Sequence, residues 1–451
     1  MVKPVMVIGG GIAGIEASLN LAELGVPVYL VESSPSIGGV MARLDKTFPT
    51  NDCSICIEAP KMYEVKRNPN ITIMSYCDVK EVKGRAGEFE VTLLRKARFI
   101  DEEKCVGCGK CAEACPVEIA DELDGKIGGK RKLIYMSFPQ SIPNVYTIDY
   151  RCRYVRQHPE MRGRGVCVDT CIIDCASCRE CPIAKCIRAC KDEGRDAVKL
   201  WQRDRKVRLN VASIILATGL RSSEPPTGVY GYNIYPDVLT ILQYERMLHS
   251  CGPTGGELRK PSNSEKPKRI AWILCASKGE KYGVPCCSKI CCMISTKQAI
   301  LTKDHEKDVE TYIFYTNLRT YAKDFYNYYR RALDLNVQYI RGKPSYVYHE
   351  SGFLTLTYED TITGYVGKMN VDIIVLATPF LPAEGNREIA KIFNVELDDY
   401  GFIKESERNP TETSIEGIYV CGSASGPKDI SESVVEAIAA SMNAAKWALE
   451  A

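Results

Sequence analysis

The stretch Val5-Met-Val-Ile-Gly9-Gly-Gly11-Ile-Ala-Gly14 joins an apolar run to a group of closely spaced glycines. The apolar run predicts a buried parallel strand, and the glycines predict a tight turn that opens a helix. In dinucleotide-binding patterns, glycines form the turn, let a pyrophosphate approach the backbone and let helix and strand pack closely. A glycine turn that binds no ligand is the alternative. We therefore expect an α/β fold built on a parallel sheet, with Gly9, Gly11 and Gly14 beside a phosphate.

The residues that follow favour a flavin nucleotide. Val28-Tyr-Leu-Val-Glu32 predicts a second strand that ends in an acid, at the spacing that binds ribose hydroxyls. Gly38-Gly39 then extends the pattern in the manner of flavoproteins. Together, Glu32 and Gly39 indicate FAD rather than NAD as the cofactor.

Two later strands predict that the chain returns to this first sheet. Val211-Ala-Ser-Ile-Ile-Leu-Ala-Thr218-Gly219 is an apolar strand followed by a turn, which would place Thr218 and Gly219 at the cofactor. Near the end, Gly417-Ile-Tyr-Val-Cys421-Gly422 precedes an alanine-rich helix over about 432–449. Gly422 and Asp429 are expected where the start of that helix meets the flavin. Cys421 is expected to be buried.

The run Cys105-Val-Gly-Cys108-Gly-Lys-Cys111-Ala-Glu-Ala-Cys115-Pro116 has the cysteine spacing of bacterial ferredoxins. In two-cluster ferredoxins the first three thiolates bind one 4Fe–4S cluster and the cysteine before proline binds the other. A zinc ribbon, the alternative, would have two separated Cys-x2-Cys pairs and no Cys-Pro. The run predicts a ferredoxin-like domain inserted between two parts of the FAD domain.

The second half of this insertion has irregular spacing. Its cysteines are Cys152, Cys167, Cys171, Cys175, Cys178, Cys181, Cys186 and Cys190. Spacing favours the last four as the second motif, so the crossover rule assigns Cys105, Cys108, Cys111 and Cys190 to one cluster and Cys178, Cys181, Cys186 and Cys115 to the other. The remaining four, Cys152, Cys167, Cys171 and Cys175, either bind a third cluster or are free thiols. A domain with one cluster and a degenerate second half is the alternative.

Cys53-Ser-Ile-Cys56 lies in a polar, turn-rich stretch before a predicted helix. A Cys-x2-Cys pair of this kind is either a redox dithiol facing a flavin or two ligands of a cluster completed from another domain or partner. Buried structural thiols are a third interpretation. We favour the cluster, because most other cysteines in the chain are spaced as iron ligands.

Arg269-Ile-Ala-Trp-Ile-Leu-Cys275 predicts the first strand of a second parallel-sheet domain. The glycine pattern is missing there, and Cys286-Cys287-Ser-Lys-Ile-Cys291-Cys292 opens the next helix instead. Thiolates at this turn would exclude a nicotinamide nucleotide, and Cys275, Cys287, Cys291 and Cys292 form a plausible four-ligand site. An apolar, cysteine-rich helix start is the alternative. Lys297, one turn further on, would reach a flavin and tune the electronics of its N5 atom, unless it is a solvated surface charge.

Overall composition excludes several classes of protein. The chain has 451 residues, 22 cysteines, four histidines and a net charge of +2. This length predicts two or three domains, and the near-neutral charge gives no sign of nucleic-acid binding. No apolar run approaches the ~20 residues of a membrane span. Without a signal peptide, cysteines at cluster spacings indicate a reducing cytoplasm rather than disulfides in a secreted protein.

The combination of GGGIAG, FPTNDCSIC, CVGCGKCAEACP, CSKICC and GPKDI resembles the A component of heterodisulfide reductase and its HdrA-like relatives, over essentially the whole chain. The resemblance implies a thioredoxin-reductase-like FAD module with an inserted ferredoxin, and electron transfer within large complexes, in some members by flavin-based electron bifurcation. It supports Cys275, Cys287, Cys291 and Cys292 as cluster ligands, suggests Lys297 near flavin N5, and suggests Glu245 as a flavin neighbour. Longer members carry an N-terminal domain and a C-terminal ferredoxin that this chain lacks, so partner subunits would supply electrons.

We therefore expect an oxidoreductase subunit that passes electrons between FAD and several 4Fe–4S clusters. Its partners would resemble the B and C components of heterodisulfide reductase (HdrB and HdrC), or hydrogenase- or dehydrogenase-linked donors and acceptors. The rivals are a self-contained pyridine-nucleotide disulfide reductase using Cys53 and Cys56, and a passive electron wire with a structural flavin. The expected divisions are 1–100 (FAD domain, first part), 101–200 (inserted ferredoxin-like domain), 201–261 (FAD-domain return and linker), 262–370 (second nucleotide-binding-like domain) and 371–451 (FAD domain, C-terminal part).

Overall fold

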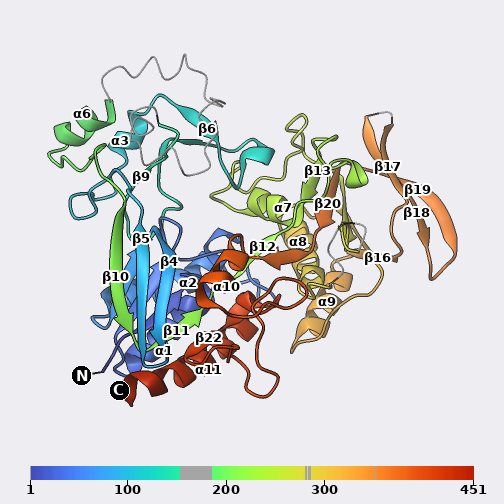
Figure 1. Cartoon of the computed structure of the whole chain (residues 1–451). Helices are drawn as coiled ribbons and strands as arrows, with labels where there is room; N and C mark the ends of the chain where they lie inside the picture. Colours follow the sequence, from blue (N-terminus) through green and yellow to red (C-terminus); the bar gives the residue numbers. More distant parts are fainter. Residues whose placement is uncertain (1, 153–184, 280–281, 283–285, 351, 451) are drawn as a thin grey trace.

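A computed structural model describes residues 2–152, 185–279, 282, 286–350 and 352–450 of the chain. The described chain contains two parallel five-stranded sheets and several smaller antiparallel sheets (Figure 1). The predicted α/β class, with two domains of the dinucleotide-binding type and an insertion, is confirmed.

The first parallel sheet is formed by the strands that carry the N-terminal glycine pattern and the two returns. Its order is β22 (Ile418–Val420), β11 (Ser213–Leu216), β1 (Val5–Ile8), β2 (Val28–Glu32) and β3 (Ile71–Ser75). Every neighbouring pair is parallel, with Val5 opposite both Ser213 and Val28. The strands that are first, middle and last in the sequence therefore meet side by side.

Alternation along β1 divides the first domain into two cores, because successive strand residues point to opposite faces. Val5 and Val7 face the helical layer, where α1 (Ile12–Glu23), α2 (Ser54–Arg67) and α11 (Ile430–Leu449) supply the packing. Met6 and Ile8 face an antiparallel sheet. That sheet has the order β10 (Arg205–Val211), β5 (Glu88–Arg95) and β4 (Cys77–Arg85).

The second parallel sheet repeats this plan. Its order is β13 (Val238–Thr240), β20 (Ile373–Ala377), β14 (Arg269–Leu274), β15 (Glu310–Tyr315) and β16 (Gln338–Arg341). One face packs on α7 (Ile241–Leu248), α8 (Cys291–His305) and α9 (Phe325–Asp334). The other face packs on the antiparallel strands β17 (Tyr346–Glu350), β18 (Phe353–Asp360) and β19 (Tyr365–Val371).

Two short strands join the parallel-sheet domains. β12 (Leu220–Ser222) leaves the first domain, β21 (Phe380–Pro382) leads back to it, and the two pair antiparallel. The returning chain forms α10 (Asn386–Phe393), whose Ala390 and Phe393 join the core of the first domain. The short helices η1 (Met41–Arg43), η4 (Val229–Gly231) and η6 (Gly422–Ala424) lie in turns.

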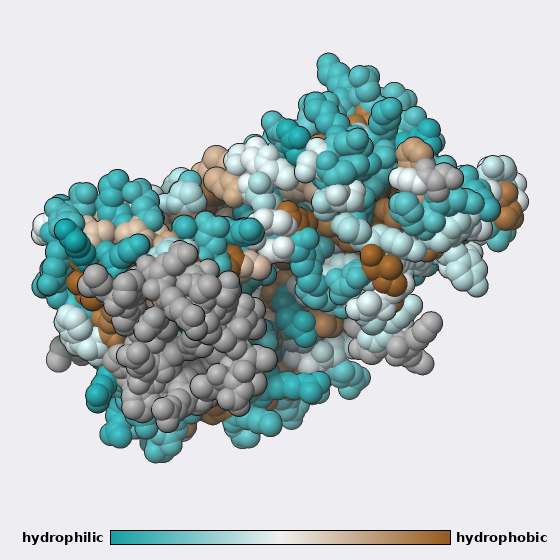
Figure 2. Space-filling model, turned by 90° about the horizontal axis from the view of Figure 1, so that it is seen from above, coloured by the Kyte–Doolittle hydropathy of each residue, from teal (hydrophilic) through white to brown (hydrophobic). Residues whose placement is uncertain are grey.

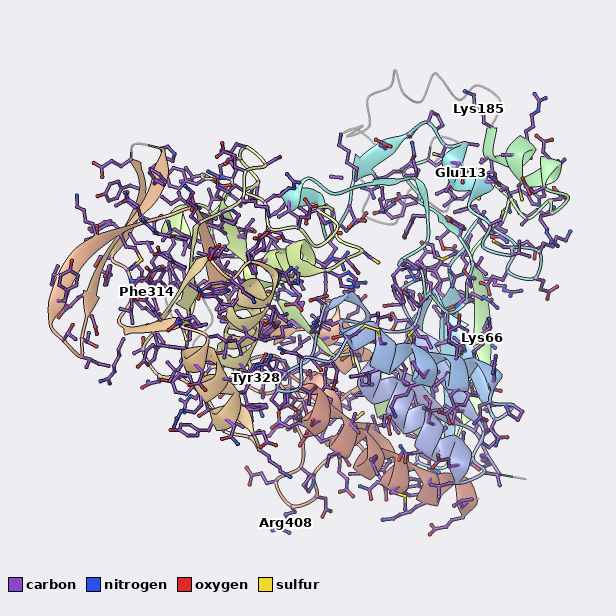
Figure 3. All side chains as sticks on the ribbon, turned by 180° about the vertical axis from the view of Figure 1, so that it is seen from behind. Lys66, Glu113, Lys185, Phe314, Tyr328 and Arg408 are labelled. Atoms are coloured by element: carbon purple, nitrogen blue, oxygen red, sulfur yellow. A yellow bond between two sulfur atoms is a disulfide. The ribbon has the colours of Figure 1, made fainter. Side chains whose placement is uncertain are left out.

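The inserted segment leaves the first domain after β5 and returns at β10. Because Arg95 pairs with Arg205 in the antiparallel ladder, the segment begins and ends at adjacent strand ends. Its described elements are α3 (Lys110–Glu113), β6 (Glu118–Ala120), η2 (Gly125–Ile127), β7 (Lys130–Lys132), β8 (Ile134–Tyr135), β9 (Thr147–Ile148) and α6 (Lys185–Asp192). Figure 3 shows Glu113 and Lys185 together at the end of the insertion, far from Arg408.

Hydrophilic residues cover most of the face in Figure 2, with hydrophobic residues in small groups. Within the described residues, no helix has both the length and the apolar character needed to cross a membrane.

Candidate functional site

The N-terminal glycine loop has no room for side chains. Gly9 has φ +111°, and a Cβ there would lie 2.2 Å from the carbonyl oxygen of Ala217 on the neighbouring strand. A Cβ on Gly14 would lie 1.8 Å from the carbonyl oxygen of Gly9. These two glycines hold α1 against the sheet, as the sequence pattern requires.

Gly11, in the N-terminal loop, and Gly39, in the loop after β2, are both partly exposed and lie against each other. Gly39 has φ +59°, and a Cβ on it would lie 2.7 Å from the Cα of Gly11. Two bare backbone segments therefore meet at the N-terminus of the 12-residue helix α1. Free amides and the helix dipole at such a position fit a pyrophosphate.

Glu32 lies at the end of β2 beside this loop. Its carboxylate accepts hydrogen bonds from the backbone N–H groups of Gly10 and Ser34, both at 2.7 Å. Oε1 also accepts from the Ser33 hydroxyl at 3.4 Å. A carboxylate has about four lone-pair positions, so Oε2 keeps capacity for a ribose hydroxyl. The residues present at this end therefore fit the adenosine half of FAD.

The other predicted cofactor residues have mainly structural contacts. The Thr218 hydroxyl donates to Asn386 Oδ1 at 2.9 Å, and Gly219 has φ +74° with open space around it. Gly422, with φ +62°, packs against the first turn of α1, where a Cβ would lie 2.7 Å from Ala13 Cβ. Asp429 caps α11 by accepting from the N–H of Glu432, and Tyr321 also donates to it. The Asp-x-x-Glu spacing of this capping box is visible in the sequence.

Three cysteines of the first motif and one that is distant in sequence line one small cavity of about 20 Å³ in the insertion. They are Cys105, Cys108, Cys111 and Cys190. Burial, followed by the charges of the other three sulfurs, raises the pKa of Cys111 to about 12. Burial thus favours the neutral thiol while no metal is bound, and binding of iron would require these thiols to lose their protons. The structure thus gathers the four residues that the crossover rule assigns to one cluster.

The second predicted cluster of the insertion lies partly outside the described residues. Cys115 and Cys186 are buried in the same hydrophobic core as Cys111, and Cys152 packs against that core. The other cysteines predicted as ligands here, Cys167, Cys171, Cys175, Cys178 and Cys181, lie outside the described residues. Their assignment stays a prediction.

A second group of thiols lies where β14 ends and α8 begins. Cys275, at the end of β14, has its pKa raised by burial and by the nearby Cys292 and Cys287 sulfurs. Cys291 and Cys292 share a hydrogen bond that raises the pKa of Cys291 and lowers that of Cys292. Cys286 lies next to the group, and burial raises its pKa. The structure therefore brings together the four cysteines predicted at the second site.

The donor set suits a cluster better than a single ion. Within the described residues, no three His, Cys, Asp or Glu side chains are placed to hold one metal ion. In a 4Fe–4S cube the thiolates bind different iron atoms at different corners, so they surround the cluster rather than converge on one point. Cysteine thiolates are the usual ligands of such clusters, so the residue types of both thiol groups fit.

Lys297 in α8 and Glu245 in α7 form a buried ion pair in the second parallel-sheet domain, where it contacts the first domain. Lys297 Nζ lies 2.5 Å from Glu245 Oε1 and donates to the backbone oxygen of Lys46 at 2.7 Å. Each of the two side chains is 2% exposed. Glu245 also accepts from the N–H of Asp45 at 3.0 Å and from Gln298 at 2.9 Å. Lys297 is thus an internal charge that binds α8 to the loop after η1, and the solvated-surface interpretation is wrong.

The segment 45–58 carries buried polar atoms without hydrogen-bond partners. They are Asp45 Oδ2, Asn51 Nδ2, Ser54 Oγ and both carboxyl oxygens of Glu58. Glu58 is completely buried on the face of α2 that also carries Ser54 and Met62. Met62 in turn lies 3.4 Å from the Cβ position of Gly38. Sequence reasoning missed Glu58, although its spacing from Met62 places it on the apolar helix face.

We predict that Glu58→Gln makes the protein more stable at alkaline pH. Burial raises the pKa of Glu58 to about 9, so the folded state favours the neutral acid. The contribution of the neutral Glu58 side chain to folding stability is complete at pH values below the ordinary pKa of 4.5, and it is lost as pH rises toward 9. Between these two pH values, the free energy of unfolding of the wild type should fall by up to about 1.4 kcal/mol per pH unit relative to that of the variant. Urea unfolding at pH 5.5, 7 and 8.5 measures this difference.

The exposed Glu64 on the same helix provides the control. Glu64→Gln should leave the pH dependence of the unfolding free energy unchanged. Parallel stability curves for the wild type and Glu58→Gln would contradict the prediction.

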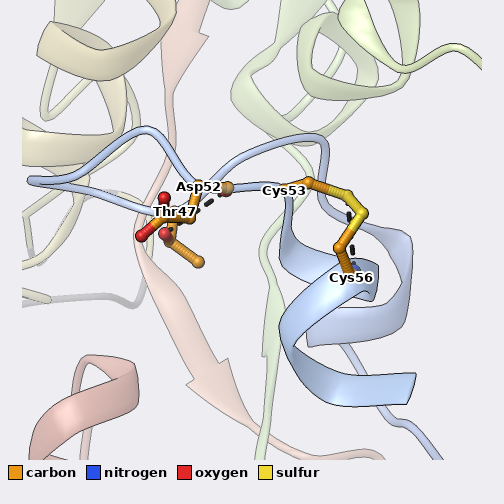
Figure 4. The surroundings of a disulfide bond; sticks show 4 residues. All are labelled: Thr47, Asp52, Cys53 and Cys56. Atoms are coloured by element: carbon orange, nitrogen blue, oxygen red, sulfur yellow. Dashed lines mark hydrogen bonds between the residues drawn. A yellow bond between two sulfur atoms is a disulfide. The ribbon is translucent and has the colours of Figure 1, made fainter. Parts of the chain in front are cut away.

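Cys53 and Cys56 are joined by a disulfide at the start of α2 (Figure 4). The preceding hairpin is closed by the backbone hydrogen bond from Thr47 to Asp52. In this state neither sulfur is a thiolate, so the predicted role as cluster ligands applies only to a reduced form. The bond corresponds to the dithiol alternative from the sequence.

Two family models match parts of the chain. A 4Fe–4S binding domain matches residues 98–120, and an FAD-dependent oxidoreductase matches residues 4–50. These are the segments that carry the first ferredoxin motif and the glycine loop. The matches support 4Fe–4S clusters and FAD as cofactors.

The chain is similar to several curated proteins. It is 40% identical over 442 residues to the iron–sulfur A component of the CoB–CoM heterodisulfide reductase of Methanocaldococcus jannaschii, covering 96% of this chain and 63% of that protein. It is 40% identical over 447 residues to the A component of the H2:CoB–CoM heterodisulfide,ferredoxin reductase of Methanothermobacter marburgensis. That match covers 98% of this chain and 63% of that protein. The chain thus spans just under two thirds of these relatives' length.

Similarity to solved structures extends to the fold alone. Thioredoxin reductase from Lactococcus lactis matches over the whole of both chains with a TM-score of 0.51 and 12% identity. Thioredoxin reductase from T. acidophilum matches over 98% of each chain with a TM-score of 0.50 and 12% identity. Taken with the cysteine groups and the glycine loop, these findings show that the chain is similar, over the part of those proteins that it covers, to the A components of heterodisulfide reductases.

Proposed function

We propose that this chain is an electron-transferring oxidoreductase subunit, in which 4Fe–4S clusters exchange electrons with FAD. The position of the second thiol group carries the proposal. Lys289, between Cys287 and Cys291, forms a 2.6 Å ion pair with Glu432 in the first turn of α11. The cysteine site of the second domain is therefore adjacent to the helix whose N-terminus faces the predicted flavin site. That adjacency supports an electron path between the two.

The residues of the two thiol groups and of the buried ion pair have distinct proposed roles. Cys275, Cys287, Cys291 and Cys292 hold one cluster, and Cys105, Cys108, Cys111 and Cys190 hold another. FAD supplies the conversion between two-electron and one-electron transfer when bound. Lys297 holds a fixed positive charge between the domains, with Glu245 orienting its ammonium group through their 2.5 Å contact. We assign residues 101–200 to the inserted cluster domain. The predicted bounds 262–370 of the second domain are too narrow, because β13, α7 and β20 also belong to its sheet and helical layer.

The insertion serves as the contact with one redox partner and the second thiol group with another. Relatives are named for ferredoxin, H2 or F420H2 together with a heterodisulfide. By analogy, we infer that partner subunits deliver low-potential electrons to this chain and remove them. Splitting an electron pair between high- and low-potential acceptors, as in flavin-based bifurcation, is the finer proposal for the flavin.

Anoxic purification from the native host tests the proposal. About twelve iron atoms or more per FAD fit the cluster assignments, whereas about four or fewer contradict the two-cluster insertion. A low-potential donor should reduce the flavin in the purified complex. Absence of flavin reduction would favour a passive wire, and rapid NADPH oxidation by the chain alone would favour a self-contained pyridine-nucleotide reductase.

A further inference from the structure

Three basic residues follow three neighbouring strands of the second parallel sheet. Lys278 comes after β14, Arg319 after β15 and Lys343 after β16, and these strands are adjacent and parallel. The three residues therefore lie at the edge of the sheet where the carboxyl ends of the strands meet. The second thiol group begins at the same edge, because Cys275 directly follows β14.

The three basic residues act directly on the thiols. Lys343 Nζ donates to the backbone oxygen of Cys275 at 2.8 Å. The charges of Lys343 and Lys278 both favour the thiolate form of Cys275, against the effect of its burial. A hydrogen bond with the neighbouring cysteine favours the thiolate form of Cys292 most, and the backbone N–H and the charge of Arg319 add to it. Positive charge thus reaches the group from three separate loops.

Within the described residues, none of these three cations has a carboxylate partner. No ion pair of the described chain involves Lys278, Arg319 or Lys343. The charges of Lys278 and Lys343 instead repel one another. By contrast, Lys289, which also lies beside the group, is paired with Glu432 at 2.6 Å. An anionic group held by the thiols would compensate the three unpaired charges.

The backbone around the thiols adds to the positive potential. The N–H of Lys289 donates to Cys287 Sγ at 3.4 Å. The helix α8 also begins at the group, and the dipole of this 15-residue helix is positive at that end. Asp398 opposes these effects, but it acts on Cys286, which is outside the proposed ligand set. The site as a whole therefore favours negative charge.

Burial works in the opposite direction. Cys291 is 3% exposed and Cys292 is 1% exposed, whereas Cys108 in the thiol group of the insertion is an exposed residue. Reduction of a 4Fe–4S cluster adds one electron, which the flavin supplies in the proposed function, and it makes or breaks no bond. Burial disfavours the added negative charge, and the potential of a cluster depends on burial, net charge and hydrogen bonds to its sulfurs. Nearby cations reduce this cost, most strongly where the local dielectric constant is low.

We propose that Lys278, Arg319 and Lys343 raise the reduction potential of the cluster held by the second thiol group, so that this buried cluster accepts electrons from the flavin. The three residues act through their charge and do not bind iron. This inference rests on the proposed function, which places a cluster at this group. It adds the residues that set the potential of that cluster.

Potentiometric titration of the anoxically purified complex, followed by EPR spectroscopy, tests the inference. The signal that disappears in Cys291→Ser belongs to this cluster. In Arg319→Gln/Lys343→Gln, the equilibrium constant for its one-electron reduction should fall about tenfold, which lowers the midpoint potential by about 59 mV. Two exposed cations at roughly 8 Å contribute about this much when the effective dielectric constant lies between those of a protein surface and water.

Two control variants separate charge from packing. Arg319→Lys/Lys343→Arg keeps both charges and should keep the wild-type potential. Lys307→Gln removes an exposed lysine just beyond the far end of α8, about 22 Å along the helix from the thiols. It should leave the potential unchanged, because salt screens exposed charges within about 8–10 Å. The clusters of the insertion are the internal reference, and the iron content of all these charge variants should equal that of the wild type.

Failure of this inference and failure of the proposed function give different results. An unchanged potential in Arg319→Gln/Lys343→Gln, with the cluster present, would overturn the inference and leave the proposed function intact. An equal fall in potential in the charge-conserving variant would assign the effect to packing and overturn the inference as well. Wild-type iron content and EPR signals in Cys291→Ser would overturn the cluster at this group, and with it the proposed function.

Discussion

Cys291→Ser should lower the iron content by about four atoms per chain while FAD stays bound. Cys291 is 3% exposed and lies at the centre of the second thiol group, where it shares a hydrogen bond with Cys292. Serine is a poor iron ligand and leaves three thiolates for a four-thiolate cube. The glycine loop that would hold the FAD phosphates lies in the other parallel-sheet domain. Iron quantification and flavin absorbance of the anoxically purified complex measure both quantities.

Cys77→Ser is the matched control for this substitution. Cys77 is also buried, at 1% exposure, but it lies in β4 and contacts the backbone oxygen of Ser75 rather than other cysteines. Its replacement should leave the iron content unchanged. Loss of FAD with all iron retained in Cys291→Ser would contradict the cluster assignment.

Lys297→Met should destabilise the protein by about 3–5 kcal/mol, because it leaves the Glu245 carboxylate buried without its cation. The Glu245 oxygens would keep only the hydrogen bonds from Asp45 and Gln298. The contact to the Lys46 backbone would be lost as well, which weakens the junction between the two domains. Urea unfolding monitored by tryptophan fluorescence measures the loss.

The double variant Lys297→Met/Glu245→Gln should recover much of this stability, because it removes both charges. Such recovery is the signature of a pair whose single substitutions strand a buried charge. If the effects of the two substitutions on the free energy of unfolding simply added up, the ion pair would not be the source of the lost stability. A shift of the flavin midpoint potential in Lys297→Met, with flavin still bound, would in addition support its proposed role as a fixed charge near the flavin.

Much of the fold follows from local patterns in the sequence. Gly9 and Gly14 are required where the first strand, the return strand and α1 touch, and any side chain there would overlap backbone atoms. The apolar strands and glycine turns also predicted the two returns to the first sheet, which are β11 and β22. β13 was not predicted, because three residues that precede a helix carry too little periodicity.

The candidate site was only partly accessible to such reasoning. The group Cys275, Cys287, Cys291 and Cys292 was predicted from its place at a strand end and a helix start, and the structure brings these residues together. Glu58 was missed, since one acid on a mostly polar helix looks like an ordinary surface residue. A redox dithiol was one of three open interpretations of Cys53 and Cys56, and the cluster was favoured, because Cys-x2-Cys spacing suits both roles.

By itself the sequence determined which residues supply the chemistry: the glycines of the nucleotide loop and the cysteines with cluster spacing. Their roles depend on the backbone conformation and ligand geometry of a few neighbouring residues, and short-range spacing encodes both. Only the tertiary structure decided which distant groups meet. It placed Cys190 with Cys105 and joined Lys297 to Glu245 and Lys46. These contacts arise from the packing of separate domains, and that packing depends on the buried surfaces of the whole chain rather than on any single segment.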